Sequence, residues 1–421
     1  MKIVLCGGEP SDCWNSIGNK VYAFSLFFFL VGTYLLPEHI KIFAIIYVLA
    51  MAFCILCTMR IEITPTTCGW CLFAGLGLLS CMIHGSRNLL DAVKFVVSIM
   101  MGLMMLSVFT SKKARVNALY AVFAVGMVVM LGCTLQLVAP ELLVKINSIT
   151  LGESKFLIFS DFYSWGGLVG FSYQTGVTGY YLGILLGFVL CVLFFDEHLR
   201  KSQKLALVIA SVVIVAFILL TAKRSVLLIA AVLTYALLCY RNKKSLMKIV
   251  SMTVLFFVCA SVLLCCTGAG RALIKRTMGS NPLSGRVEIY SQMIELIKQK
   301  PIFGHGFGST LAYIQRFRNG HNIYLQVLME NGIVGLLILG AVFVYHLLFT
   351  YRTLRKHGPG ERCSVAISLY IQLFFLGIGF FGNPLYDVFP LIIYMAAVGV
   401  VYTQNTGEKD YAREMDCGSD I

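Results

Sequence analysis

The sequence predicts an all-α polytopic membrane protein. Of its 421 residues, 58% are hydrophobic and only 13% are charged, whereas about a quarter of the residues in soluble globular domains are charged. The mean hydropathy is +0.83. Apolar stretches recur along the whole chain, each close to the length of about 20 residues that a helix needs to cross a hydrocarbon core.

These stretches predict about twelve transmembrane helices. No small-residue cleavage pattern follows the first one, so we expect a retained span and not a signal peptide. We therefore expect a single integral membrane domain over residues 1–421, ending in a tail over residues 404–421. The predicted spans cover residues 21–36, 40–59, 66–83, 89–109, 116–138, 177–195, 205–222, 225–240, 246–267, 323–350, 363–382 and 386–403.

The distribution of basic residues predicts that both termini are cytoplasmic. Counted from a cytoplasmic N-terminus, the inner segments hold nineteen of the 34 Lys and Arg residues, and the short outer loops hold six. Lys and Arg are enriched in cytoplasmic loops of membrane proteins. The net charge of +14 arises mostly from this bias, which matches anionic lipid head groups and gives no indication of nucleic-acid binding.

One outer turn departs from this bias. Thr221–Ser225 joins two long apolar runs and carries Lys223 and Arg224 on the side of the membrane where basic residues are depleted. Because such a tight turn has little room for other groups, we expect these two cations to hold an anion.

Two outer loops are much longer than the rest, over residues 139–176 and 268–322, the second between spans 9 and 10. Long loops without a domain of their own are usually functional or disordered. Their many apolar and aromatic residues favour packing on the membrane surface.

The second loop contains the pattern of an amphipathic helix. It begins at the N-cap candidate Ser284, places Val287, Tyr290, Met293 or Ile294, and Ile297 on one face, and ends at Lys300-Pro301. Arg286 lies in the first turn, where a cation opposes the helix dipole. A bound anion would remove this conflict; the alternative is that Arg286 reaches lipid phosphates.

Chemistry-bearing residues near the tenth span are few. His321 opens that span and is a candidate general base, although a histidine there could also cap the helix or sit among head groups. We expect Gly332, eleven residues on, to share its helix face. Glu330 is isolated in sequence from other acidic residues.

The glycines of Gly304–Gly308 match neither a dinucleotide fingerprint nor a phosphate loop. We expect them to let the loop approach the membrane.

The fifteen cysteines favour packing over metal binding. Cys54-x-x-Cys57 and Cys68-x-x-Cys71 have the doublet form of a zinc site. Cys54 and Cys71 lie inside apolar runs, where thiols behave as small hydrophobic groups. We predict no metal site.

Three segments, preceded by the basic outer turn, resemble the signature of the O-antigen ligase / O-antigen polymerase (Wzy-type) family. They read SGRVEIY from Ser284, KPIFGHGFG from Lys300 and HNIYLQVLMENGIVG from His321. The resemblance is strong from residue 220 to residue 340. The rest of the chain agrees in span count and in the position of the large outer loop.

The resemblance implies a GT-C-like glycosyltransferase on the outer face of a bacterial cytoplasmic membrane, with no cofactor. Its partners would be an undecaprenyl-diphosphate-linked saccharide as donor, a saccharide or lipid-linked acceptor, membrane lipids and other polysaccharide-assembly membrane proteins. By the same resemblance, Arg224 and Arg286 would grip the diphosphate and His321 would activate the acceptor hydroxyl. The expected substrate-binding residues are Lys223, Asn322, Tyr324 and Gln174.

Several functions remain open at this point. We favour polymerisation of lipid-linked oligosaccharide repeats of an O-antigen or capsule; the alternative is a ligase that transfers the glycan to a lipid A core or another terminal acceptor. A transporter or flippase for the same substrate would predict inverted repeats and polar midplanes, which the sequence does not display. A catalytically inactive scaffold would tolerate the loss of His321.

Overall fold

The computed structural model describes residues 2–4, 12–58, 60–62, 64–83, 89–108, 112–241, 251, 286–314, 320–356 and 358–417. The N-cap candidate Ser284 and, apart from residue 251, the predicted span 246–267 lie outside these residues.

Helices dominate the described part of the chain, and eleven of the twelve predicted spans coincide with one. By length and composition, seven helices of the described part could cross a membrane, and four shorter apolar helices accompany them. The helices are α1 (Asp12–Leu35), η1 (Pro37–His39), α2 (Ile40–Thr58), α3 (Pro65–Ile83), α4 (Leu89–Val108), α5 (Lys112–Val138), α6 (Pro140–Thr150), α7 (Glu153–Ser164), α8 (Thr175–Phe195), α9 (Lys201–Leu220), α10 (Arg224–Arg241), α13 (Arg286–Gln299), α14 (Ser309–Tyr313), α15 (Ile323–Lys356), α16 (Pro359–Gly379) and α17 (Val388–Cys417).

A small β-ribbon departs from the all-α prediction. β1 (Lys2–Val4) pairs antiparallel with β2 (Arg60–Glu62), with Ile3 opposite Ile61. Strands of three residues are too short to show a periodic pattern in the sequence, so this ribbon could not be anticipated.

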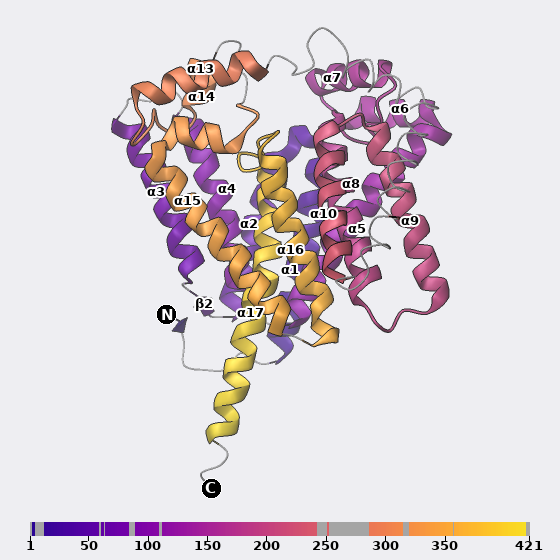
Figure 1. The fold of residues 1–421 in the computed structure, drawn as a ribbon, viewed down its shortest axis with the longest axis vertical. Helices are drawn as coiled ribbons and strands as arrows, with labels where there is room; N and C mark the ends of the chain where they lie inside the picture. Colours follow the sequence, from indigo (N-terminus) through magenta and orange to yellow (C-terminus); the bar gives the residue numbers. More distant parts are fainter. Residues whose placement is uncertain are drawn as a thin grey trace.

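The two termini lie at the same end of the helix bundle (Figure 1). The opposite end, here called the upper end, carries α6, α7, α13 and α14 (Figure 1). The described parts of both long outer loops thus fold at one end as short helices, and α13 lies across the top of α15.

Helix α8 lies at the centre of the bundle, and small residues let it approach its neighbours. A Cβ at Gly183 would lie 2.2 Å from the ring of Phe374, and one at Gly187 would lie 2.0 Å from the ring of Tyr370. Small residues at such positions permit close helix–helix packing in membranes. Large apolar side chains are instead exposed on the outward faces of the peripheral helices, as expected of surfaces in contact with lipid; examples are Leu49, Leu131, Val212 and Leu337.

Replacing Gly187 with Ala should destabilise the fold by about 1–3 kcal/mol, because the added methyl group would overlap the Tyr370 ring. Thermal unfolding of the purified protein in detergent measures this loss. Gly75→Ala on α3 is the matched control, since its Cβ would meet no atom within 4 Å. Equal melting temperatures for the two variants would contradict the close packing of α8 against α16.

Candidate functional site

One part of the candidate site lies at a break in helix α15. α15 runs from Ile323 to Lys356, but Gly332 has φ 63° and ψ −169°, which is not helical. A break leaves carbonyls before it and amides after it without intrahelical partners. Within a membrane such groups must find partners in the protein. The expectation that Gly332 shares a helix face with His321 is therefore wrong, because the helix is interrupted there.

Residues 301–306 fill this break with backbone hydrogen bonds. The amides of His305 and Gly306 donate to the carbonyls of Met329 and Glu330, at 2.9 and 2.7 Å. Beyond the break, the Ile333 amide donates to the Pro301 carbonyl at 2.8 Å, and the Val334 amide donates to the Ile302 carbonyl at 3.3 Å. The loop thus takes the place of the missing turn of helix.

The close approach between the 301–306 segment and the break in α15 explains why glycine stands at positions 304 and 332. A Cβ at Gly332 would lie 2.1 Å from the Ile302 carbonyl oxygen, and one at Gly304 would lie 2.4 Å from the Glu330 carbonyl carbon. Both residues also have positive φ, at 63° and 69°, a region that glycine enters without steric cost. The sequence analysis expected the glycines of Gly304–Gly308 to serve an approach to the membrane; in the structure, Gly304 approaches the backbone of α15 and Gly306 approaches Cys81 of α3.

Below the upper surface, the carboxylate of Glu330 accepts hydrogen bonds from α14, from α15 and from the turn before α17. Its Oε1 accepts from the Thr310 hydroxyl at 2.7 Å and from Gln326 Nε2 at 3.1 Å, and its Oε2 accepts from the Tyr386 hydroxyl at 2.7 Å. Glu330 is fully buried. Gln326 in turn accepts from the Gly320 amide at 3.2 Å and from Asn383 Nδ2 at 2.9 Å.

His321 stands just above this network in a strained backbone conformation, with φ 52°. Non-glycine residues with positive φ are uncommon and cluster at functional sites. The Tyr290 hydroxyl donates to the His321 carbonyl at 3.2 Å. Partial burial raises the pKa of Tyr290, and the nearby Arg286 guanidinium opposes that rise. Tyr290 thus contacts the backbone of His321 and lies near Arg286.

The residues after His321 have structural partners of their own. Asn322 Oδ1 accepts from the amides of Tyr324 and Leu325, at 3.0 and 3.1 Å, so Asn322 and not His321 caps α15. The Tyr324 hydroxyl donates to the Leu376 carbonyl at 2.8 Å, and its ring lies 4.5 Å from that of Phe380. Their predicted roles in substrate binding remain predictions.

The α13 helix forms as its pattern predicts, but its buried face is shifted. Ile289 and Met293 are buried and pack with Ile314 and Met329. Val287, assigned to the apolar face in the sequence, is 58% exposed. The shift arises because the helix packs on Met329 of α15 and on Ile314.

On the other side of the upper end, the basic turn is as tight as the sequence indicates. α9 ends at Leu220 and α10 begins at Arg224. Between them, Ala222 has φ 54°, in the left-handed region. Among the non-glycine residues that the structure describes, only Ala222 and His321 have a positive φ. The Thr221 hydroxyl is buried and donates to the Ile218 carbonyl at 2.6 Å.

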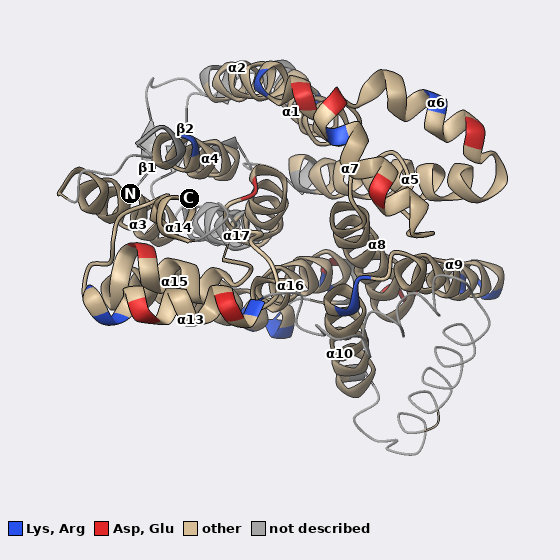
Figure 2. Ribbon diagram, turned by 90° about the horizontal axis from the view of Figure 1, so that it is seen from above, with Lys and Arg blue, Asp and Glu red and all other residues tan. Residues whose placement is uncertain are grey.

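Lys223 lies against the first turn of α8. A Cβ at Gly176 would lie 3.3 Å from Lys223 Nζ, and the same Nζ lies 5.7 Å from the centre of the Phe162 ring. Arg224 and Arg286 are the first residues of α10 and α13. Figure 2 shows Lys and Arg on α13 and between α8 and α10. Three basic residues thus stand at three helix N-termini, where dipole and side-chain charge have the same sign and together favour an anion.

The first outer loop folds onto this turn. The Gln136 side chain of α5 holds the loop, since its Nε2 donates to the Gly167 carbonyl and its Oε1 accepts from the amides of Val169 and Gly170, all at 2.8 Å. The Leu168 amide donates to the Leu220 carbonyl at 3.0 Å. Gln174 precedes α8, and its Nε2 donates to the Tyr173 hydroxyl at 3.2 Å.

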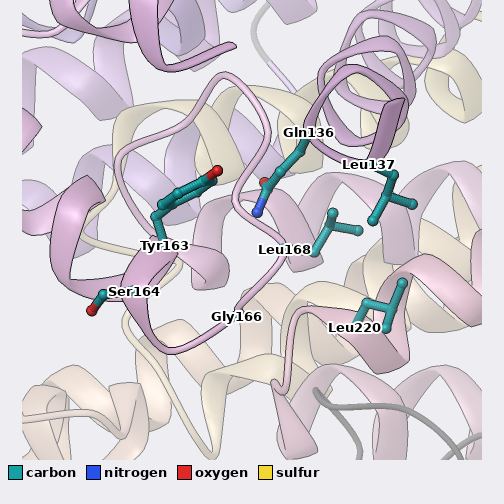
Figure 3. A pocket seen from close by; sticks show the side chains of 7 residues that line it. All are labelled: Gln136, Leu137, Tyr163, Ser164, Gly166, Leu168 and Leu220. Carbon is teal, nitrogen blue, oxygen red and sulfur yellow. The ribbon is translucent and has the colours of Figure 1, made fainter. Parts of the chain in front are cut away.

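A pocket of about 330 Å³ opens between this loop and the ends of α5, α7 and α9. Figure 3 shows its lining, which is mostly apolar apart from Gln136, Tyr163 and Ser164. Leu220 connects the pocket to the basic turn. No lining residue belongs to α13 or α15, so this pocket and His321 are separate features of the upper end.

Asp387, which the sequence analysis did not single out, lies between the two sides. It ends the turn of residues 380–387 and precedes α17. Its side chain is exposed. It interacts electrostatically with Tyr173, just before α8, and with Tyr180 and Tyr181 in the first turns of α8. An acidic residue inside the predicted span 386–403, one position from its start, was the available signal.

The described residues hold no group of three His, Cys, Asp or Glu that could bind a metal ion. Cys54 is buried and its Sγ–H donates to the Gly18 carbonyl at 3.3 Å. Cys68 and Cys71 are exposed.

Residues 209–340 match the family model described as O-antigen ligase. This segment is an O-antigen ligase family domain. It contains Lys223, Arg224, Arg286, His321 and the whole broken region of α15, whereas Gln174 and Asp387 lie outside it. The match supports an O-antigen ligase/polymerase family assignment for this segment, and the apolar helices of the described residues are typical of an integral membrane protein. No curated protein matches the chain.

Replacing Gly332 with Ala should destabilise the O-antigen ligase domain by at least about 3 kcal/mol, because Ala would be strained at this backbone conformation and would collide with the Ile302 carbonyl. Thermal unfolding in detergent measures the loss. Gly340→Ala on the same helix is the control, since its Cβ would meet no atom within 4 Å. A Gly332→Ala protein as stable as this control would contradict the loop-filled break.

Proposed function

We propose that this protein transfers a glycan from an undecaprenyl-diphosphate-linked donor to a hydroxyl acceptor, on the outer face of a bacterial cytoplasmic membrane, with cytoplasmic termini. The observation that carries the proposal is the placement of Lys223, Arg224 and Arg286 at the starts of three helices, within a domain of the O-antigen ligase family. A diphosphate is the anion that such a lipid-linked donor presents.

The cations act on the leaving group. As the bond between the anomeric carbon and the phosphate oxygen breaks, negative charge grows on the diphosphate. Guanidinium groups fixed beforehand stabilise this charge more in the transition state than in the ground state, which is the condition for catalysis. Ala222, strained at φ 54°, helps set the geometry of the turn that carries Lys223 and Arg224.

His321 is the proposed general base. Its ring takes the proton of the acceptor hydroxyl as that oxygen bonds to the anomeric carbon, while the diphosphate leaves with the electron pair of the broken bond. A single displacement of this kind inverts the anomeric centre and needs no metal. A positioned base contributes about 10²–10⁴-fold to the rate. The Tyr290 hydroxyl, bonded to the His321 carbonyl at 3.2 Å, keeps the base near Arg286.

We favour polymerisation, in which the acceptor is another lipid-linked repeat unit of an O-antigen or capsule. The second candidate is ligation to a lipid A core or another terminal acceptor, and the description of the matched family as O-antigen ligase favours it. Both reactions use the same donor and the same bond-making step, so the acceptor alone separates them. A lipid-linked saccharide flippase is the remaining alternative.

Proteoliposomes supplied with an undecaprenyl-diphosphate oligosaccharide should show glycan transfer by the wild type. His321→Ala should lower the rate by about 10²–10⁴-fold, because the base is lost, and Arg286→Ala should lower it as well. Chromatography of the lipid-linked products measures the rate. Lys298→Ala is the matched control, since Lys298 is an exposed cation on the same helix, paired with Glu295.

The products separate the candidate functions. Lengthening of the lipid-linked glycan without any added acceptor indicates a polymerase. Transfer only after addition of lipid A core or another acceptor indicates a ligase. Full activity of the His321→Ala protein would contradict the proposed mechanism, and movement of the donor across the bilayer without any new glycosidic bond would indicate a flippase.

A further inference from the structure

Glu330 is fully buried, and the proposed chemistry leaves it without a role. Its carboxylate is nonetheless the meeting point of three segments that are distant in sequence. Thr310 of α14, Gln326 of α15 and Tyr386 of the turn before α17 all donate to it, at 2.7, 3.1 and 2.7 Å. The Thr310 amide adds a longer bond at 3.4 Å.

One branch of this network leads to His321. Because Gln326 Nε2 donates to Glu330, the amide is oriented so that its Oε1 accepts from the Gly320 amide at 3.2 Å and from Asn383 Nδ2 at 2.9 Å. A flipped amide would turn its NH₂ group toward two donors. Glu330 thereby fixes the backbone N–H of the residue directly before His321.

His321 needs such support because its backbone is strained. A residue held at φ 52° persists only where its surroundings hold it there. Two contacts do so on either side of the residue: the Tyr290 hydroxyl bonds to the His321 carbonyl, and Gln326 bonds to the Gly320 amide. The second of these contacts depends on Glu330.

The other branch leads to Asp387. Tyr386, whose hydroxyl donates to Glu330 Oε2, is the residue directly before Asp387. Asn383 of the same turn bonds to Gln326. One buried carboxylate therefore ties the segment carrying His321 to the turn that faces α8 and the first outer loop.

We infer that Glu330 is a positioning residue, which holds His321 in its reactive place through Gln326 and Gly320 and fixes the 380–387 turn opposite it. This inference rests on the proposed function of His321 as the base. Glu330 itself touches no substrate. Its contribution is geometric, and a displacement of a reacting group by about 1 Å is enough to lower a rate on the order of 10²-fold.

The test compares kcat and KM for the undecaprenyl-diphosphate oligosaccharide in the proteoliposome assay, for Glu330→Met and Glu330→Gln. Met fills the same volume but accepts no strong hydrogen bond, so kcat should fall about 10²-fold while KM for the donor stays nearly unchanged. Gln keeps an oxygen for Thr310 and Gln326 and turns its NH₂ toward the Tyr386 hydroxyl, which can accept, so it should retain most of the activity. Glu295→Met, exposed on α13, is the control.

A double variant separates positioning from general damage. If Glu330 acts through His321, adding Glu330→Met to His321→Ala should cost almost nothing further in kcat. If Glu330→Met lowers kcat by the same factor in the wild type and in the His321→Ala protein, the inference is overturned. It is also overturned if Glu330→Met raises KM and leaves kcat unchanged. Where Glu330→Met does not fold, Gln326→Met carries the same comparison, since it cuts the link to Gly320 and leaves Glu330 bonded to Thr310 and Tyr386.

The outcomes also distinguish a failure of the proposed function from a failure of the positioning role of Glu330. If His321→Ala keeps full activity, the proposed function fails whatever Glu330 does. If His321→Ala is impaired while Glu330→Met and Gln326→Met are both as active as the wild type, only the positioning role fails.

Discussion

The upper end of this protein depends on four backbone hydrogen bonds between residues 301–306 and the break in α15. In a hydrocarbon environment, the open carbonyls and amides of a broken helix have no water to bond with. The chain supplies a loop in place of water, and the loop fits only because glycines at 304 and 332 remove the side chains that would keep the two backbones apart. His321, Glu330 and the start of α15 all take their positions from this junction.

Broken helices are also typical of transporters, where the interrupted backbone lines the substrate cavity. Here the break is filled by the protein's own loop. The filled break holds Glu330 and the start of α15 at the upper end, which also carries Arg286 and the turn of Lys223 and Arg224. Basic residues at helix starts suit chemistry on an anionic group.

Long apolar runs were enough to predict eleven of the helices, because length and hydropathy alone decide what can span a bilayer. The α13 helix also followed from its periodicity. The break at Gly332 did not, because residues 323–350 read as one continuous apolar run and the groups that fill the break come from about thirty residues earlier. The Asn331-Gly332 pair was the local signal of an interruption.

The sequence indicates only part of the candidate site, because many of the site's contacts join segments that are distant in sequence. Basic residues in outer segments and the family signature indicated Arg224, Arg286 and His321. The sequence left Glu330 isolated, since its partner Tyr386 is 56 residues away, and Asp387 comes near Tyr173 and Tyr180 only in the folded chain. Contacts between distant segments have no periodic signature, so these two residues required the structure.

The central claim is that Lys223, Arg224 and Arg286 hold a diphosphate beside His321. A cryo-electron microscopy structure of the protein in lipid nanodiscs with undecaprenyl diphosphate would test it most directly. The account predicts phosphate density within hydrogen-bonding reach of these three side chains, at the starts of α8, α10 and α13. Phosphate density at another part of the protein, with these side chains turned away from it, would contradict the account.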